Sequence, residues 1–441
     1  MVVVFALVAL AVVGVLVTAN WYVWRRLFRD TTRGPGTARR VGAVVVAGGW
    51  ALAVGALVAE RAGAPFWLQR VLAWPGFLWL ALSLYLLLAV LAGEVVRPLL
   101  RRFLERRAAA RPAARRAAAR PADPGELPDP AADPERIPAG TAPPRTPPAG
   151  PEQTAASGAT PPSPLAVPSR RLFVSRVVAG AAAAAAVGTV GYGTYGVLRG
   201  PKVKRVTVPL AKLPRAAHGF RIAVVSDIHL GPVLGRGFAQ TVVDTVNSTQ
   251  PDLIAVVGDL VDGSVKDLGP AASPLARLRA RHGAYFVTGN HEYFSGAEQW
   301  VAEVRRLGLV PLENARTELP HFDLAGVNDV AGEDEGQGPD YAKALGDRDR
   351  ARAVVLLAHQ PIQIHDAVDH GVDLQLSGHT HGGQLWPGSL VAEAANPTVA
   401  GLERYGDTQL YVSRGAGAWG PPTRVGAPSD ITVIELASRQ A

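Results

Sequence analysis

The chain has 441 residues, of which 48% are hydrophobic, and its mean hydropathy is +0.13. This apolar content predicts membrane-spanning segments, and the length suits about two or three domains. Because the sequence contains no cysteine, disulfide bonds, thiolate metal sites and cysteine nucleophiles are excluded. The formal net charge of +8 reflects arginines concentrated in residues 25–40 and 97–120, which indicates membrane orientation rather than nucleic-acid binding.

Three apolar runs occupy the first quarter of the chain, at residues 2–24, 41–59 and 73–93. Each is long enough to cross a hydrocarbon core of roughly 30 Å. Arginine-rich segments follow the first and third runs, and the positive-inside rule assigns such segments to the cytoplasm. We therefore predict a three-helix transmembrane region over residues 1–104, with the N-terminus outside.

Residues 105–168 are rich in Pro, Ala and Arg, which predicts a disordered cytoplasmic linker. A fourth apolar segment, residues 169–200, begins with Arg170 and Arg171 in "SRRLFVS", which resembles a twin-arginine export signal. The alternative is an ordinary transmembrane helix with basic flanks. Both interpretations place the rest of the chain outside, and the missing A-x-A cleavage site predicts an uncleaved anchor.

From about residue 203, short apolar runs alternate with helical stretches, which is typical of a layered α/β domain. Five of these runs end in a polar cluster: "FRIAVV" before "SDIHL", "DLIAVV" before "GDLVDG", "AYFV" before "TGNHEY", "AVVLLA" before "HQP", and "DLQL" before "SGHTHGGQ". Each of the five apolar runs is predicted to form a buried strand. Because ligands bind at the carboxyl ends of strands in open α/β sheets, we expect the clusters to converge at one edge.

The clusters share side chains that bind metal ions through oxygen or nitrogen. They are Asp227, His229, Asp259, Asn290, His359, His379 and His381. Such a mixed set suits Mn, Fe or Zn better than Mg or Ca alone. It also exceeds the needs of one tetrahedral ion. We therefore predict two divalent or trivalent ions that share a carboxylate and hold a phosphate between them.

The ordered motifs D-x-H, G-D-x-x-D-G, G-N-H-E, a lone His and G-H-T-H, within residues 203–437, resemble the calcineurin-like metallophosphoesterase superfamily. The tail 411–436 resembles the membrane-associated or twin-arginine-exported bacterial phosphodiesterase subgroup. The resemblance implies a metallophosphoesterase domain over residues 203–441, folded as a four-layer α/β/β/α sandwich. About four transmembrane helices precede it.

The resemblance also implies a role for each residue of the site. Ligands of the first metal would be Asp227, His229 and His381, and those of the second Asn290, His359 and His379, with Asp259 bridging. His291 would contact phosphate and assist the leaving group, so we expect His291 and Asp259 to be catalytic. Apart from the resemblance, Glu292 is expected to be an orienting group rather than a ligand. Asp262 is expected to form a turn by bonding its own backbone, and the alternative is that it orients a ligand.

These observations predict a membrane-anchored binuclear metal-dependent phosphoesterase, and more narrowly a phosphodiesterase. A metal-bound hydroxide would attack the phosphate ester at the outer face of the cell membrane. Expected partners are a phosphoester substrate that could be lipid-linked, the membrane and the twin-arginine export machinery, with no nucleic acid. The alternative is a non-catalytic metal-binding scaffold or sensor. The complete ligand set favours the enzyme, and the spans carry no central ionisable residue for transport.

Overall fold

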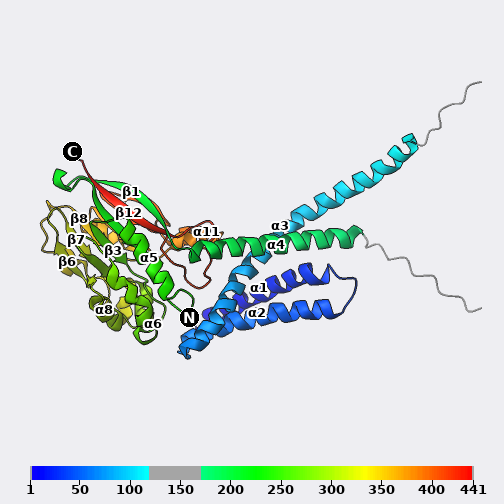
Figure 1. The fold of residues 1–441 in the computed structure, drawn as a ribbon, viewed down its shortest axis with the longest axis horizontal. Helices are drawn as coiled ribbons and strands as arrows, with labels where there is room; N and C mark the ends of the chain where they lie inside the picture. The colour runs from blue at the N-terminus through cyan, green and yellow to red at the C-terminus, as the bar shows by residue number, and fades with distance from the viewer. Residues whose placement is uncertain (1, 119–169, 440–441) are drawn as a thin grey trace, which may run out of the picture.

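The computed structural model describes residues 2–118 and 170–439. Figure 1 shows a layered domain from which the long helices extend on one side. The long helices are α1 (Val2–Trp24), α2 (Thr37–Arg61), α3 (Phe66–Ala118) and α4 (Arg170–Leu198). The layered domain begins at β1, so the boundary between the two parts lies near Gly200, which adopts a left-handed φ of +92°.

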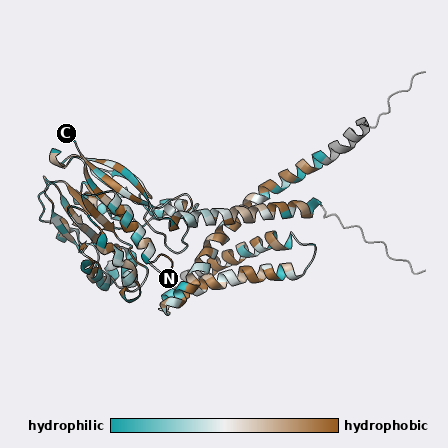
Figure 2. Ribbon diagram, viewed as in Figure 1, coloured by the Kyte–Doolittle hydropathy of each residue, from teal (hydrophilic) through white to brown (hydrophobic). Residues whose placement is uncertain are grey.

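Within the described residues, three helices are long and apolar enough to cross a membrane: Thr37–Arg61, Phe66–Arg107 and Arg170–Leu198. They contain the second, third and fourth predicted spans, and Figure 2 shows how apolar they are. The first predicted span, residues 2–24, folds as the uncharged helix α1. Helix α3 continues to Ala118, past the expected start of the linker at residue 105, because Ala and Arg are strong helix formers. The rest of that linker, residues 119–168, lies outside the described residues.

The layered domain contains two six-stranded sheets, with strand orders β1-β12-β2-β3-β4-β5 and β10-β11-β9-β8-β7-β6. The first comprises β1 (Lys202–Leu210), β2 (Phe220–Val225), β3 (Leu253–Val257), β4 (Ala284–Val287), β5 (Val310–Pro311) and β12 (Asp430–Ser438). The second comprises β6 (Ala315–Glu318), β7 (Asp323–Gly326), β8 (Val354–Leu357), β9 (Leu374–Ser377), β10 (Gly401–Tyr405) and β11 (Thr408–Val412). Both sheets are mixed. In the first, β2, β3 and β4 run parallel and β12 pairs antiparallel with β2; in the second, β7 pairs parallel with β8 and antiparallel with β6.

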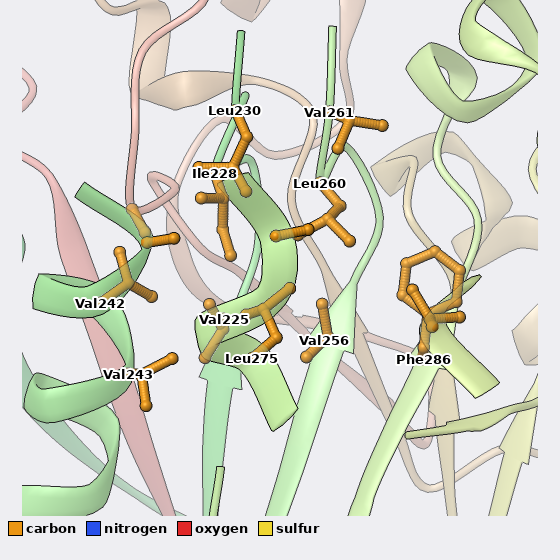
Figure 3. Packing of buried hydrophobic residues seen from close by; sticks show 14 of the residues in the cluster. Val225, Ile228, Leu230, Val242, Val243, Val256, Leu260, Val261, Leu275 and Phe286 are labelled. Atoms are coloured by element: carbon orange, nitrogen blue, oxygen red, sulfur yellow. The ribbon is translucent and has the colours of Figure 1, made fainter. Parts of the chain in front are cut away.

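Three apolar clusters hold the layers together. One lies between the sheets and joins Val224 and Leu253 to Leu324 and Val355. A second lies between the first sheet and α5 (Arg236–Ser248), α6 (Val265–Ala272) and α8 (Ala297–Arg306), as Figure 3 shows in part. A third lies between the second sheet and α9 (Tyr341–Leu345) and α10 (Ile364–Asp369). The four-layer α/β/β/α sandwich is thereby confirmed.

The inner strands are apolar at nearly every position because both of their faces are covered. All five residues of β3, "LIAVV", are buried, as expected for a strand with a helix layer on one side and another sheet on the other. All five predicted strands are present, but they belong to two sheets: β2, β3 and β4 to the first, β8 and β9 to the second. The polar clusters therefore meet where two sheet edges adjoin, and not along one edge.

Candidate metal centre

The first group of candidate ligands is Asp227, His229 and His381, whose ligand atoms lie within 4.8 Å of one another. Asp227 and His229 follow β2, whereas His381 follows β9 in the other sheet. His381 Nε2 lies 3.0 Å from His229 Nε2 and 3.3 Å from Asp227 Oδ1. All three side chains are buried, so their polar atoms converge on one point away from bulk water.

The second group is Asp259, His359 and His379, which follow β3, β8 and β9. Asn290 joins it from the start of α7 (Asn290–Ser295), with Oδ1 3.0 Å from His379 Nδ1. Asp259 lies between the groups: its Oδ2 is 3.2 Å from His359 Nε2 and 3.7 Å from His229 Nε2. The structure thus brings all seven predicted ligands together, while their roles as ligands remain predictions.

The backbone is strained at most of these positions. Five of the seven residues have left-handed φ values: Asp227 (52°), His229 (50°), Asp259 (52°), His379 (71°) and His381 (53°). This conformation is uncommon outside glycine, and a sparsely populated conformation of this kind costs of order 1–3 kcal/mol per residue. Each strand therefore turns sharply as it ends, which aims the next polar side chain into the centre.

A glycine lets the two sheet edges approach at the centre. A Cβ atom at Gly378, just after β9, would collide with Ser226 Oγ and Asp227 Oδ2 in the other sheet. The amide of the next residue, His379, donates to Asp227 Oδ1 at 3.0 Å. The G-H-T-H motif therefore needs its glycine for the close approach of the two edges, while its histidines supply the ligand atoms.

Hydrogen bonds to Nδ1 orient the imidazoles. His229 Nδ1 and His291 Nδ1 both donate to Asp262 Oδ1, at 2.8 and 2.7 Å, and His359 Nδ1 donates to Val257 O at 2.9 Å. The Nε2 atoms of His229 and His359 are left to face the centre, as in carboxylate–histidine–metal arrangements. Asp262 is therefore an orienting residue, which was the alternative to the turn role that the sequence favoured. The parallel bridge between Leu230 and Val261 brings it beside His229.

Glu292 holds the backbone around Asp259, as the sequence predicted for an orienting group. Its carboxylate accepts from the amides of Asp259 (3.0 Å), Leu260 (2.7 Å) and Gly289 (2.7 Å). The side chain is fully buried. Burial and the neighbouring Asp259 raise the pKa of Glu292 to about 7, so the position of Asp259 depends on an acid that is itself costly to ionise.

Arg424 is a buried residue of the centre that the sequence did not reveal. Its Nη1 donates to His381 O at 2.9 Å, its Nη2 lies 3.1 Å from His381 Nδ1, and its Nε donates to Gly417 O at 2.7 Å. Burial lowers the pKa of Arg424 to about 10. It lies in a Pro- and Gly-rich loop far along the chain from His381, so no local pattern points to it.

The donor set fits metal ions on two observations of this structure. His359 Nε2 is buried and makes no hydrogen bond with any described residue, although Asp259 Oδ2 is close. Carboxylates also surround His229: burial lowers its pKa, but Asp262, Asp259 and Asp227 outweigh burial and raise the pKa to about 9. Both features indicate that the centre binds positive charge. The mixture of carboxylate, amide and imidazole donors suits Mn, Fe or Zn.

The calcineurin-like phosphoesterase profile matches residues 220–383, which contain all seven candidate ligands and His291. An uncharacterized metallophosphoesterase of Helicobacter pylori strain J99 is 37% identical over 273 residues, which are 61% of this chain and 73% of that protein. The chain belongs to the metallophosphoesterase family. As a metallophosphoesterase it is a hydrolase of phosphoric esters, and the twin-arginine subgroup remains a prediction.

Other relatives of this metallophosphoesterase include a Danio rerio "Transmembrane protein with metallophosphoesterase domain", 38% identical over 259 residues. That alignment covers 56% of this chain and 59% of the fish protein. The Bacillus subtilis uncharacterized metallophosphoesterase YkuE is 31% identical over 280 residues, which are 61% of this chain and 98% of that protein. Apolar helices and the name of the fish relative together indicate membrane association of the metallophosphoesterase.

His291 of this metallophosphoesterase is held beside both groups of ligands. Its backbone amide donates to Asp259 Oδ1 at 3.0 Å, and its Nδ1 is bound by Asp262. Two exposed aromatic rings, Phe294 and Trp419, flank its imidazole at centroid distances of 5.5 Å each. With Nδ1 occupied, Nε2 is the ring nitrogen left for a substrate oxygen.

Proposed function

We propose that this metallophosphoesterase hydrolyses a phosphodiester at the outer face of the membrane, with Asp227, His229, Asp259, Asn290, His359, His379 and His381 as metal ligands and His291 and Asp259 as catalytic residues. The observation that carries the proposal is the convergence of these ligand atoms beside His291 at the adjoining sheet edges. Metal ions bound there would offset the charge of the phosphate and activate a water molecule.

The chain's own residues would act on the leaving group. In its imidazolium form, His291 can pass the Nε2 proton to the departing oxygen and keep the Nδ1 proton, because Asp262 accepts from Nδ1 and Asp259 holds the backbone. No nucleophilic serine or cysteine is required. Asp262 and Glu292 would keep His229, His291 and Asp259 in place during the reaction.

An acidic residue of α2 supports a diester over a monoester. Glu60, at the end of α2, interacts electrostatically with Asp262 and His291, so in its ionised form it adds negative charge near His291. A phosphodiester carries one negative charge at neutral pH, whereas a monoester carries close to two. Repulsion from Glu60 therefore opposes the monoester more strongly.

The arrangement of the helices supports the outer face. The layered domain lies beside the start of α1, the connection between α2 and α3, and the end of α4, whereas the arginine-rich ends of these helices point away from it (Figure 1). Segments rich in arginine stay in the cytoplasm. The layered domain would then be on the opposite side of the membrane.

The activity is tested on the purified full chain with added Mn²⁺. We expect a higher kcat/KM for bis-p-nitrophenyl phosphate than for p-nitrophenyl phosphate, and a loss of about 100-fold or more in His291→Ala and Asp259→Ala. His365→Ala is the matched control, because His365 is exposed and lies against Tyr405, away from the centre. A chain that binds Mn²⁺ yet hydrolyses neither ester would support the scaffold or sensor instead.

Orientation is tested separately. Since the chain has no cysteine, Glu318→Cys on β6 provides a single thiol, and its side chain is 69% exposed. Labelling of intact cells by a membrane-impermeant maleimide is expected. Labelling that requires broken cells would place the layered domain in the cytoplasm and contradict the proposal.

A further inference from the structure

We propose that residues 384–395, here called the rim segment, lie in the membrane beside α3 and α4, so that the substrate is an amphiphile of the same bilayer. The rim segment follows His381 and Gly383 directly and contains helix α11 (Gly388–Ala395). The substrate would carry its phosphoester in a headgroup and its hydrocarbon chain in the membrane. This substrate class rests on the proposed function, whereas the location of the rim segment does not.

The layered domain contacts α4 well inside the apolar stretch of that helix. Thr194 Oγ1 lies 2.7 Å from Thr423 Oγ1, and the amide of Arg424 donates to Gly193 O at 3.4 Å. Deeper still, the side chain of Val425 packs against the cluster that contains Val190. Val190 precedes the end of α4 by eight residues, which corresponds to about 12 Å along a helix.

The rim segment reaches a similar depth. Leu385 packs against the same cluster as Val190, and the Trp386 carbonyl accepts a hydrogen bond of 2.9 Å from Tyr85 Oη of α3. Tyr85 belongs to the apolar stretch of α3 that is long enough to cross a membrane. If α3 and α4 are embedded in a bilayer, the start of the rim segment is embedded with them.

The free surface of the rim segment suits lipid better than water. Helix α11 has the sequence "GSLVAEAA" and none of its residues is buried. Leu390 is 62% exposed, Val391 72% and Trp386 54%. Adjacent exposed apolar residues indicate a contact that excludes water, and Trp beside aliphatic residues is typical of the membrane interface. Continuity with the contacts to α3 and α4 identifies the bilayer as what covers this surface.

The same surface leads to His291. Gln384 Nε2 donates to Trp419 O at 2.9 Å, which ties the rim segment to Trp419. The exposed rings of Trp419 and Phe294 both flank His291. The rim segment is therefore joined through Gln384 to the loop whose Trp419 ring lies beside His291.

The connection between α2 and α3 also adjoins the centre. Val233, in the loop after His229, packs against Phe77 and Ala56 of these helices, and Phe66 packs against the core of the layered domain. Glu60, at the end of α2, is within electrostatic range of His291. Both the rim segment and the connection between α2 and α3 thus lie close to the centre, which favours entry of the substrate from the bilayer.

The location is tested by fluorescence on the full chain in phosphatidylcholine vesicles. Leu390→Cys introduces a single thiol for an environment-sensitive fluorophore, because the native chain has none. We expect a blue-shifted emission that is quenched by spin-labelled lipids and protected from aqueous iodide. Glu318→Cys, on the far sheet, is the control and should show the reverse.

Two results would overturn the location. Quenching of the Leu390→Cys label by iodide, as strong as for Glu318→Cys, would show that α11 faces water. Quenching by neither agent would show that another protein surface covers α11. Neither result depends on bound metal or on catalysis.

The substrate class is tested by comparing a p-nitrophenyl phosphodiester with one long alkyl chain, presented in vesicles, with soluble bis-p-nitrophenyl phosphate. We expect the ratio of the two kcat/KM values to favour the alkyl ester. The double substitution Leu390→Asp, Val391→Asp should lower that ratio roughly tenfold or more, because a charged rim segment leaves the bilayer. The control is Val310→Asp, an exposed valine on β5, which should leave the ratio unchanged.

The outcomes separate the two proposals. If neither ester is hydrolysed, the proposed function fails and the fluorescence result still decides the location. If both are hydrolysed with equal efficiency and the double substitution leaves the ratio unchanged, the enzyme is a phosphodiesterase of soluble substrates, and the membrane substrate is wrong.

Discussion

At the scale of single residues, the carboxylate of Asp262 accepts hydrogen bonds from two imidazoles that serve different purposes. His229 belongs to the first group of candidate ligands, whereas His291 is the residue proposed to protonate the leaving group. Both Nδ1 atoms lie within 2.8 Å of the same oxygen. Under the proposed function, one residue therefore couples the geometry of metal binding to that of proton transfer.

Asp262→Asn is expected to weaken Mn²⁺ binding by about 10- to 100-fold and to lower kcat as well, because the neutral amide no longer stabilises the orientation of both rings. The measurement is the apparent Mn²⁺ affinity from titration, followed by kcat at saturating Mn²⁺. Asp244→Asn is the matched control, since Asp244 is an exposed residue of α5. Wild-type affinity in Asp262→Asn would contradict the role assigned to this carboxylate.

The seven candidate ligands could be identified in the sequence for two reasons. Each lies in a short motif after an apolar strand, and each has a side chain that can bind a metal ion. Asp262 was assigned to a turn, because its partners lie 33 and 29 positions away in the sequence and only the folded chain brings them together. For the same reason, no sequence pattern pointed to Arg424. Its contacts are mostly with backbone carbonyls, which carry no residue-specific pattern.

At the scale of secondary-structure elements, the site depends on how closely the end of β9 approaches the end of β2. Ser226 and Asp227 leave no space for a side chain at Gly378. The strain of the left-handed residues on either side is tolerated because both sheets hold them rigidly.

Gly378→Ala should push the two sheet edges apart, with an expected destabilisation of about 1–3 kcal/mol and weaker Mn²⁺ binding. The same substitution at Gly237, an exposed position in α5 with open space around it, should instead stabilise by roughly 0.5–1 kcal/mol. Denaturant unfolding in detergent measures both free energies. Equal effects at the two positions would show that the close approach at Gly378 does not matter.

The strands were predictable one by one, but their arrangement was not. "LIAVV" and "FRIAVV" are apolar enough to identify buried strands, yet the apolar pattern does not say which neighbours they pair with. For example, β12 is the last strand of the chain, yet it lies between β1 and β2 in the first sheet. Likewise α3 extends beyond the predicted linker boundary, because helix propensity persists where apolar content ends.

At the scale of the whole molecule, the stability of the layered domain is expected to depend on metal binding. Two buried carboxylates, Asp227 and Asp259, and the partly buried Asp262 lie at its centre. Protons on the histidines balance part of their charge in the metal-free protein. A ligand that binds only the folded state stabilises it by mass action, so metal and protons compete for the same centre.

The increase in the apparent unfolding temperature on adding Mn²⁺ should therefore be larger at about pH 8 than at about pH 6. Burial lowers the pKa of His229, but its carboxylate neighbours raise it to about 9, so below that pH a bound metal must displace a proton. For one proton, each unit of pH below about 9 weakens apparent metal binding by up to about tenfold. His379 adds nothing to this competition at these pH values, because burial and His359 lower its pKa to about 4.

The experiment records tryptophan fluorescence during heating of the full chain in detergent, with and without Mn²⁺, at both pH values. In Asp259→Ala, which lacks the carboxylate between the two groups, Mn²⁺ should change the unfolding temperature little at either pH. A larger Mn²⁺ effect at the lower pH would mean that proton displacement does not control binding. The histidine–carboxylate centre would then not be where the metal stabilises the fold.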